Sequence, residues 1–276
     1  MKKSSIMLKS LINTIFLVAI ILVYSSCNRT NSNSNISDNE YIIRVMSYNI
    51  HYGKGINGIF SLENIAEVIK KADPDIIGLQ EISDSLMAEK LGVLTGMRAV
   101  FGASLGRSNG YGDAILCKYP FEWVSNHSIP SASSSRYQAM AIDVDFSDLP
   151  ENLGKIRIIN THFDWLRTIG SEYARLATID VIEESFFKNQ KKIPSILTAD
   201  LNSTPDSDVI KKFKNYGWVN YEDGNTYYTH SSTNPKKQID YILYRSKDEW
   251  EVKNFSVMYG EESSDHLPVI MDLIIR

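Results

Sequence analysis

The stretch Asp75-Ile-Ile-Gly-Leu-Gln-Glu-Ile82 decides the fold class. Its apolar run is short and lacks the polar alternation of a half-exposed strand, which predicts a strand covered on both faces. Just before it, the segment Ser61 to Ala72 carries an apolar face with helical spacing. Ser61 can cap this helix, and Asp73-Pro74 ends it.

The same mixture of strands and helices extends through the chain. Short β-rich runs predict strands at residues 42–47, 75–79, 114–117, 139–144, 155–160, 194–197, 239–244, 252–259 and 269–275. Helices are expected at 61–72, 171–189 and 205–214, the last opened by Thr204 with Pro205 at its first position. Many strands with interspersed helices predict a layered α/β or α+β domain. No linker or repeat interrupts residues 41–276, so we expect one domain there.

The first 40 residues have a different character. Three lysines precede an almost uncharged apolar run from Leu11 to Tyr24, and Ser25, Ser26 and Cys27 follow it. This pattern predicts a signal peptide at residues 1–26, a lipidated Cys27, and a disordered Asn- and Ser-rich tether at 27–40. The alternative is a retained N-terminal anchor helix. Both interpretations place the folded part outside the cytoplasm on a membrane surface, as an exported cell-envelope lipoprotein (periplasmic face or cell surface) or its anchored equivalent.

Charge and cysteine content limit the partners of the chain. The formal net charge is -4, and removing residues 1–26, which hold three lysines and no acids, changes it to -7. So acidic a domain is a poor match for tight, sequence-independent binding of duplex DNA, although activity on a small or transient nucleic acid is not excluded. With Cys27 lipidated, only Cys117 remains, so we expect no intramolecular disulfide.

Polar side chains stand at the ends of the predicted strands. The residues that close or open these strands are Asn49, Glu81, His162, Asp200, Asn202, Asp240, Asp265 and His266. Polar groups at strand ends can converge on one rim of a sheet. Taken singly, each has a simpler interpretation, such as a surface glutamate, a turn-forming asparagine or a helix-capping turn.

Six motifs in order resemble the endonuclease/exonuclease/phosphatase superfamily, the DNase I-like fold. They are Met46-Ser-Tyr-Asn-Ile-His-Tyr-Gly53, Leu79-Gln-Glu-Ile82, Asn160-Thr-His-Phe163, Ala199-Asp-Leu-Asn-Ser-Thr-Pro205, Ile239-Asp-Tyr-Ile-Leu243 and Ser264-Asp-His-Leu-Pro-Val269. The resemblance covers nearly everything from Ile42 onward. It implies a four-layer α/β sandwich, in which two mixed β-sheets pack face to face with helices outside.

The resemblance also implies a metal-dependent phosphoesterase that uses an activated water. Mg²⁺, with Mn²⁺ as a possible substitute, would bind Asn49, Glu81 and Asp265. Asp200 would orient and deprotonate the water, and Asn202 would hold the water or a phosphate oxygen. His266, supported by Asp240, and His162 would donate hydrogen bonds to the phosphate or the leaving group.

Substrate choice is left open at this stage. His51 stands where some family nucleases have an acidic residue, and imidazole is a poorer ligand for Mg²⁺ than carboxylate, so the number of metal ions stays open. We assign His51, with Arg136, Trp165 and Arg167, to substrate binding. Asp113 would either add charge near the cleft or cap a turn. His127 and His230 are interpreted as surface or structural positions.

The favoured substrate is a small or lipid-linked phosphodiester or phosphomonoester, meaning a nucleotide, a short nucleic acid or a lipid headgroup. The alternatives are a nuclease and a non-catalytic ligand-binding lipoprotein. No protein partner is evident in the sequence.

Overall fold

A computed structural model describes residues 41–104, 111–134, 136–148, 153–188, 192–246 and 249–275. The expected signal peptide, the lipidated Cys27 and the tether lie outside these residues. No helix in the described part is both long and apolar enough to cross a bilayer.

The first sheet is a mixed sheet with the strand order β11-β12-β1-β2-β4-β3. Its strands are β1 (Ile42–Asn49), β2 (Ile76–Ile82), β3 (Arg98–Ala103), β4 (Gly112–Cys117), β11 (Trp250–Val257) and β12 (Val269–Ile275). The pair β1 and β2 is parallel, and the other pairs are antiparallel. Side chains along β2 are buried almost throughout, as expected of a strand covered on both faces.

The second sheet has the order β5-β6-β7-β8-β10-β9. Its strands are β5 (Phe121–Ile129), β6 (Tyr137–Asp145), β7 (Lys155–His162), β8 (Ser195–Asp200), β9 (Trp218–Asn220) and β10 (Asp240–Arg245). Here β7 and β8 run parallel, while the other neighbouring strands are antiparallel.

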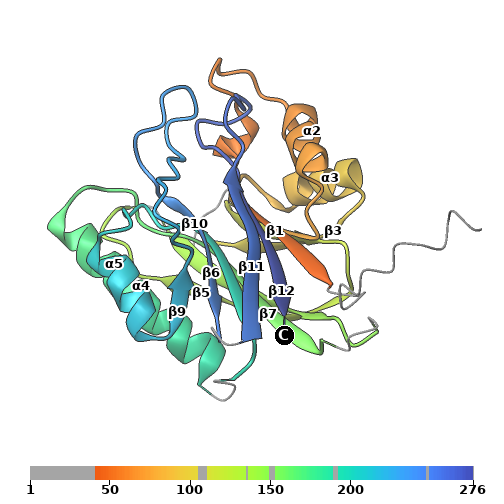
Figure 1. Cartoon of the computed structure of the whole chain (residues 1–276). Coiled ribbons are helices and arrows are strands. Elements are labelled where there is room, and N and C mark those ends of the chain that lie inside the picture. Colours follow the sequence, from red (N-terminus) through yellow and green to blue (C-terminus); the bar gives the residue numbers. More distant parts are fainter. Residues whose placement is uncertain are drawn as a thin grey trace, which may run out of the picture. The chain divides into compact units, whose positions relative to one another are not determined.

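Three apolar clusters hold four layers together. Side chains from both sheets, such as Val45 and Ile158, form the central cluster. A second cluster packs α2 (Leu62–Ala72) and α3 (Ser85–Thr95) on the first sheet, and a third packs α4 (Ile169–Phe187) and α5 (Asp208–Asn215) on the second. Figure 1 shows the two helix pairs on opposite sides of the sheets. The predicted four-layer sandwich is confirmed.

A small polar network crosses the apolar interface between the sheets. Gln80 Nε2 donates to Asn160 Oδ1 at 2.7 Å, and Thr198 Oγ1 donates to the same oxygen at 3.0 Å. Asn160 Nδ2 in turn donates to two backbone carbonyls of the first sheet. Gly78 faces this network, because a Cβ there would lie 1.9 Å from Thr198 Oγ1. The network therefore sets the register of one sheet against the other.

Several elements differ from the sequence-based expectation. The third predicted helix begins at Asp208, where Ser207 accepts a hydrogen bond from Ile210 N, rather than at Pro205. Helix α3 and strands β3, β5 and β9 were not predicted. Strand β5 lies at a sheet edge with mostly half-exposed side chains, so its sequence lacks a clean apolar pattern.

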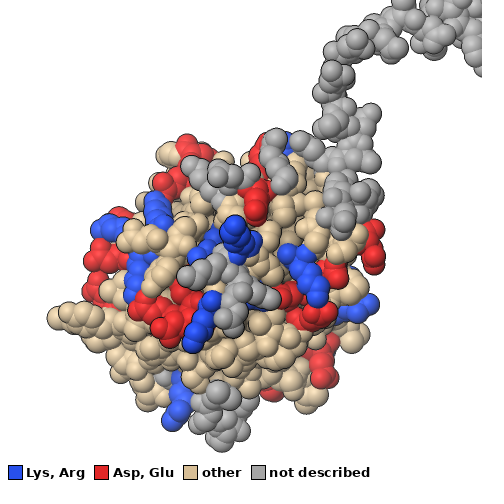
Figure 2. Space-filling model, turned by 90° about the horizontal axis from the view of Figure 1, so that it is seen from below, with Lys and Arg blue, Asp and Glu red and all other residues tan. Residues whose placement is uncertain are grey.

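The surface carries charges of both signs. On the face shown in Figure 2, Lys and Arg side chains are interspersed with Asp and Glu. That face offers no continuous basic track.

Candidate active site

The strand ends carrying the predicted polar residues meet at one edge of the sandwich. In the parallel pair β7 and β8, His162 stands opposite Asp200. Strand β10 runs antiparallel to β8, which places Asp240, at the beginning of β10, opposite Asp200 at the end of β8. In the first sheet, Asn49 ends β1 beside β2, which carries Glu81 near its end. The topology thus explains how a strand opening and several strand endings contribute to one site.

A cavity of about 440 Å³ opens at this edge. Nine of the predicted site residues line it: His51, Glu81, His162, Trp165, Arg167, Asp200, Asn202, Asp265 and His266. Four of the five histidines of the chain belong to this lining, because His230 also faces the cavity. Asn49 and Asp240 are fully buried behind it.

Asp200 is the centre of the polar contacts. Its Oδ2 accepts a hydrogen bond from Asn49 Nδ2 at 3.1 Å and lies 3.4 Å from His162 Nε2. The same oxygen is 3.8 Å from His266 Nε2, while Oδ1 accepts the backbone N–H of Asn202 at 2.9 Å. The carboxylate is therefore fixed in orientation with one oxygen surrounded by nitrogen atoms.

Asn49 joins two carboxylates across the sheets. Besides donating to Asp200, its Nδ2 donates to Glu81 Oε1 at 3.2 Å. Its Oδ1, which we expected to bind the metal, accepts the backbone N–H of His51 at 3.0 Å. A carbonyl oxygen has two lone pairs, so one is left for an ion.

His266 and Asp240 form a buried pair. His266 Nδ1 lies 2.9 Å from Asp240 Oδ2 and 3.1 Å from Oδ1. Burial by itself lowers the pKa of His266, but the negative charges of Asp240 and Asp200 outweigh it and raise the pKa to about 10. The imidazole is thus cationic at neutral pH, with Nε2 as the nitrogen not bound to Asp240.

His162 is held between two neighbours. Its Nε2 lies 3.2 Å from Asn202 Nδ2, and its Nδ1 lies 3.0 Å from the hydroxyl of Tyr111. The ring of Tyr137 packs edge-on against it. Tyr111 and Tyr137 also line the cavity, although the sequence assigned neither of them an individual role.

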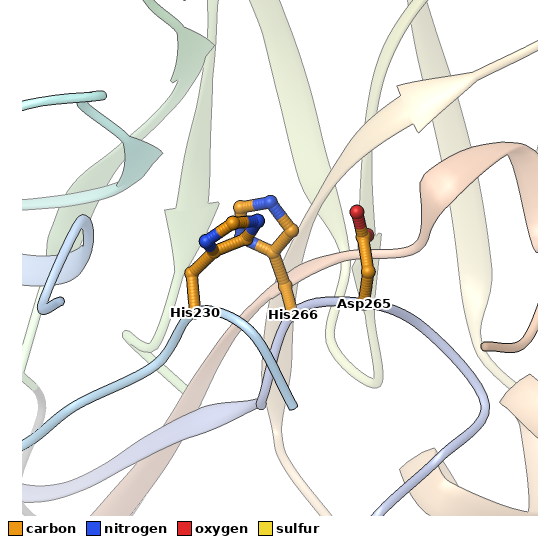
Figure 3. Close-up of side chains that lie close together, drawn as sticks. All are labelled: His230, Asp265 and His266. Carbon is orange, nitrogen blue, oxygen red and sulfur yellow. The ribbon is translucent and has the colours of Figure 1, made fainter. Parts of the chain in front are cut away.

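Asp265 and His230 flank the imidazole of His266 (Figure 3). Asp265 Oδ1 is 3.6 Å from His51 Nδ1. The ring centroids of His230 and His266 are 4.8 Å apart, and the two residues form an isolated β-bridge. The interpretation of His230 as a surface or structural position is therefore corrected. His127, by contrast, lies on β5 against Ser125 and Phe186, away from the cavity.

Trp165 and Arg167 stand on a braced loop at the cavity wall. Asp164 Oδ2 accepts from Ala132 N at 2.7 Å, and Arg175 Nη1 donates to the carbonyls of Asp164 and Leu166. The indole of Trp165 is 56% exposed. Arg167 Nη1 donates to the carbonyl oxygen of Asn202 at 2.7 Å.

Arg136 is the predicted site residue that the structure does not bring to the cavity. It is exposed and lines a neighbouring depression with Ser131 and Ser133, which shares only Tyr137 with the main cavity. Only a substrate that extends from the cavity across Tyr137 would reach Arg136.

Asp113 does not cap a turn, which was one of the two interpretations left open by the sequence. It lies within β4, is completely buried, and accepts a hydrogen bond from Gln138 Nε2 at 2.6 Å. Burial holds the pKa of its carboxyl well above the usual range, and the charges of Glu81 and Asp200 add to this effect. Both effects disfavour the charged form of this side chain.

Backbone strain gathers at the site. Among the described residues, six non-glycine residues have a positive φ, and four of them, His51, Tyr52, Glu81 and Asn202, line the cavity. Such conformations cost on the order of 1 kcal/mol each and persist where the surrounding structure enforces them.

Two groups of side chains could hold a divalent ion by proximity. Among the described residues, ligand atoms of His230, Asp265 and His266 lie within 4.8 Å of one another, and so do those of Asp200, Asp240 and His266. Glu81 belongs to neither group. It offers an open carboxylate to the cavity, which suits Mg²⁺, an ion that keeps several waters and needs few protein ligands.

Comparisons with known proteins agree with this geometry. A model of the "Endonuclease/Exonuclease/phosphatase family" matches residues 46–266. No curated protein is significantly similar in sequence.

Several solved structures share the fold. An endonuclease/exonuclease/phosphatase from Bacteroides vulgatus has a TM-score of 0.70 and 19% identity, over 86% of this chain and 100% of that chain. A mannosyl-6-phosphatase from Bacteroides thetaiotaomicron has a TM-score of 0.68 and 19% identity, over 84% and 100%. The catalytic domain of human Nocturnin has a TM-score of 0.65 and 23% identity, over 85% and 94%.

Proposed function

Because this chain belongs to the endonuclease/exonuclease/phosphatase family, we propose that it is a divalent-metal-dependent hydrolase of a phosphate ester. The observation that carries the proposal is the convergence of Asp200 with His162, Asn202 and His266 in one cavity. These residues come from positions far apart in the sequence, and they supply a base, an amide and two imidazoles around one point.

The side chains divide the work of in-line hydrolysis. Asp200 would accept the proton of an attacking water, since its carboxylate is already oriented by Asn49 and by the amide of Asn202. His266, kept cationic by Asp240, would donate from Nε2 to a phosphate oxygen. His162 would hold the leaving group or a second phosphate oxygen.

Glu81 and Asp265 would hold the metal, with the remaining lone pair of Asn49 Oδ1. When bound, Mg²⁺, or Mn²⁺ in its place, would neutralise charge on the phosphate. The fit rests on hard oxygen donors that face the same cavity as the proposed base.

The favoured substrate is a small or lipid-linked phosphodiester or phosphomonoester. A cavity of about 440 Å³ has the size of a small-molecule site. The exposed indole of Trp165 and the guanidinium of Arg167 would contact the group beyond the phosphorus. One fold relative is named as a mannosyl-6-phosphatase, which acts on a phosphomonoester.

A nuclease is the second candidate. The acidic net charge disfavours it for duplex DNA. Product analysis on sphingomyelin, inositol phosphates, and single- and double-stranded DNA separates the two. Faster cleavage of DNA than of any small or lipid substrate would favour the nuclease.

The hydrolase itself is tested with a chromogenic phosphodiester. Turnover with Mg²⁺ should disappear with chelator and fall by about 10²–10⁴ in Asp200→Ala and His266→Ala. His127→Ala, outside the cavity, is the matched control and should keep full activity. Equal turnover in every condition would contradict the proposal, and binding without turnover in the intact protein would favour a non-catalytic ligand-binding lipoprotein.

We also propose that the protein is exported and anchored to the cell envelope through lipid on Cys27, on the basis of its signal-peptide pattern. Changing Cys27 to alanine should move the protein from the membrane to the soluble fraction after cell disruption. An unchanged membrane fraction would support the retained helix instead.

A further inference from the structure

His230 and His266 form a cross-strand pair of imidazoles. The two residues face each other in an isolated antiparallel bridge, and the amide of Leu267 donates to the carbonyl of Thr229 beside them at 2.8 Å. Residues that are partners in an antiparallel bridge project to the same side. This explains why the ring centroids lie only 4.8 Å apart at the cavity wall (Figure 3).

Each ring has a nitrogen available to a ligand. His266 Nδ1 is bound to Asp240, which leaves Nε2 toward Asp200 and the cavity. Within the part of the chain that the structure describes, the ring of His230 has ring and electrostatic neighbours but no hydrogen-bond partner. The function proposed above gives His230 no task.

A carboxylate completes a set of three donors. One ligand atom each from His230, Asp265 and His266 lies within 4.8 Å of the others. Donors around a tetrahedral Zn²⁺ lie roughly 3.4 Å apart. Rotation of the rings and of the carboxylate that moves each donor atom by about 1 Å would bring the three donors to this spacing. His51 Nδ1 lies next to this set: it is buried, has no hydrogen-bond partner among the described residues, and is 3.6 Å from Asp265 Oδ1.

The donor types distinguish this set from the magnesium site. Imidazole nitrogen suits Zn²⁺ and related transition ions, whereas Mg²⁺ prefers oxygen. The Asp240 carboxylate behind His266 is the outer partner that metal-bound histidines usually have. We propose that His230, Asp265 and His266 form a binding site for a transition ion of the Zn²⁺ class, next to the oxygen donors around Glu81.

Occupation of this site would inhibit hydrolysis, a consequence that rests on the proposed function. An ion on His266 Nε2 replaces the proton that this nitrogen would donate to the phosphate, and the proton is released to solvent. Asp265 would be drawn from its magnesium role at the same time. Mg²⁺ would then activate and Zn²⁺ would inhibit through partly shared side chains.

Zinc binding is measured first, without reference to turnover. Metal-stripped, detergent-solubilised full-length protein competes for Zn²⁺ with a chromophoric chelator. We expect one tight ion per chain, at least tenfold weaker in His230→Phe, which keeps a ring without a donor. His127→Phe and Glu81→Gln are the controls and should retain tight binding, and circular dichroism checks that each variant is folded.

Inhibition is measured second, with saturating Mg²⁺ and each variant normalised to its own rate without zinc. The Zn²⁺ concentration for half inhibition should rise at least tenfold in His230→Phe and stay unchanged in His127→Phe. Equal zinc affinity in the intact protein and folded His230→Phe would overturn the site. If the intact protein shows no Mg²⁺-dependent turnover, the proposed hydrolase fails, while the chelator competition still decides the zinc site.

Discussion

Individual side chains at the site depend on partners that shift their charge state. His266 and Asp113 are both buried, yet the charged form of the first is favoured and that of the second is disfavoured. The difference lies in their neighbours, since Asp240 gives His266 a counter-charge, whereas Asp113 has an amide of Gln138 and the like charges of Glu81 and Asp200.

Replacing Asp240 by asparagine should alter the pH dependence of hydrolysis. Without the charge and hydrogen bond of Asp240, burial is opposed by fewer negative neighbours, so the pKa of His266 falls and the imidazole loses its proton at a lower pH. The kcat/KM of Asp240→Asn should fall by about 10²-fold or more at pH 8 and by less at pH 6. Parallel pH profiles for the two proteins would contradict a cationic His266 in the reaction.

Replacing Asp113 by asparagine should stabilise the protein at neutral pH. The pKa of Asp113 is higher in the folded than in the unfolded protein, so its carboxyl does not destabilise the fold below the unfolded pKa. As pH rises above that value, the carboxyl ionises in the unfolded protein first, and the free energy of unfolding falls. The neutral amide avoids this cost. Urea unfolding at pH 7 and pH 4 should show a gain for Asp113→Asn that shrinks at the lower pH, and a less stable variant at pH 7 would refute it.

At the scale of elements, the contact between β2 and β8 fixes the separation of the two sheets. Gly78 on β2 faces Thr198 on β8, with no room for a Cβ. Since Glu81 and Asp200 end these same strands, the spacing there also sets the spacing across the site.

Gly78→Ala should therefore lower the free energy of unfolding by about 1–3 kcal/mol or more, because the added methyl overlaps Thr198 Oγ1 and Asn160 Oδ1. The matched control is Gly170→Ala in the first turn of α4, where the nearest atom to a new Cβ is 3.3 Å away. That change should alter the free energy of unfolding much less, because the new methyl only touches the Cβ of Ala132 and does not overlap a neighbour. The free energies of unfolding of both variants are measured with denaturant. An equal loss in the two variants would contradict the tight contact between the sheets.

For the molecule as a whole, the central cluster between the sheets is exposed only when the sandwich opens. Cys117 is fully buried in that cluster. Burial raises the pKa of its thiol to about 12, although the amide of Tyr119 opposes the shift. Its reactivity therefore reports opening of the entire domain.

Alkylation of Cys117 by iodoacetamide at pH 8, followed by mass spectrometry of the peptide, should be slower in the folded than in the urea-unfolded protein by about the unfolding equilibrium constant. Stability should also decline above pH 9, because the unfolded thiol ionises and the folded one does not, by about 1.4 kcal/mol per pH unit. Rapid labelling of folded protein would show that the sheets separate locally.

The sequence by itself determined the layered fold and most of the site. Apolar runs such as Ile76 to Leu79 predict doubly covered strands because burial on both faces excludes polar side chains, and the polar residues that end them mark the rim. Edge strand β5 and the three-residue strand β9 were not predicted. The side chains of β5 are mostly half-exposed and β9 is very short, so neither shows a two-residue alternation of apolar and polar side chains.

Only the tertiary structure decided which of these side chains meet. The bridge that sets His230 beside His266, and the packing of Tyr111 against His162, join positions with no common motif. It also assigned the amide oxygen of Asn49 to the His51 backbone and left Arg136 outside the cavity. The local pattern of apolar and polar residues indicates which faces of an element are buried. Contacts between distant segments depend instead on strand order and register, and these are set by the packing of the two sheets.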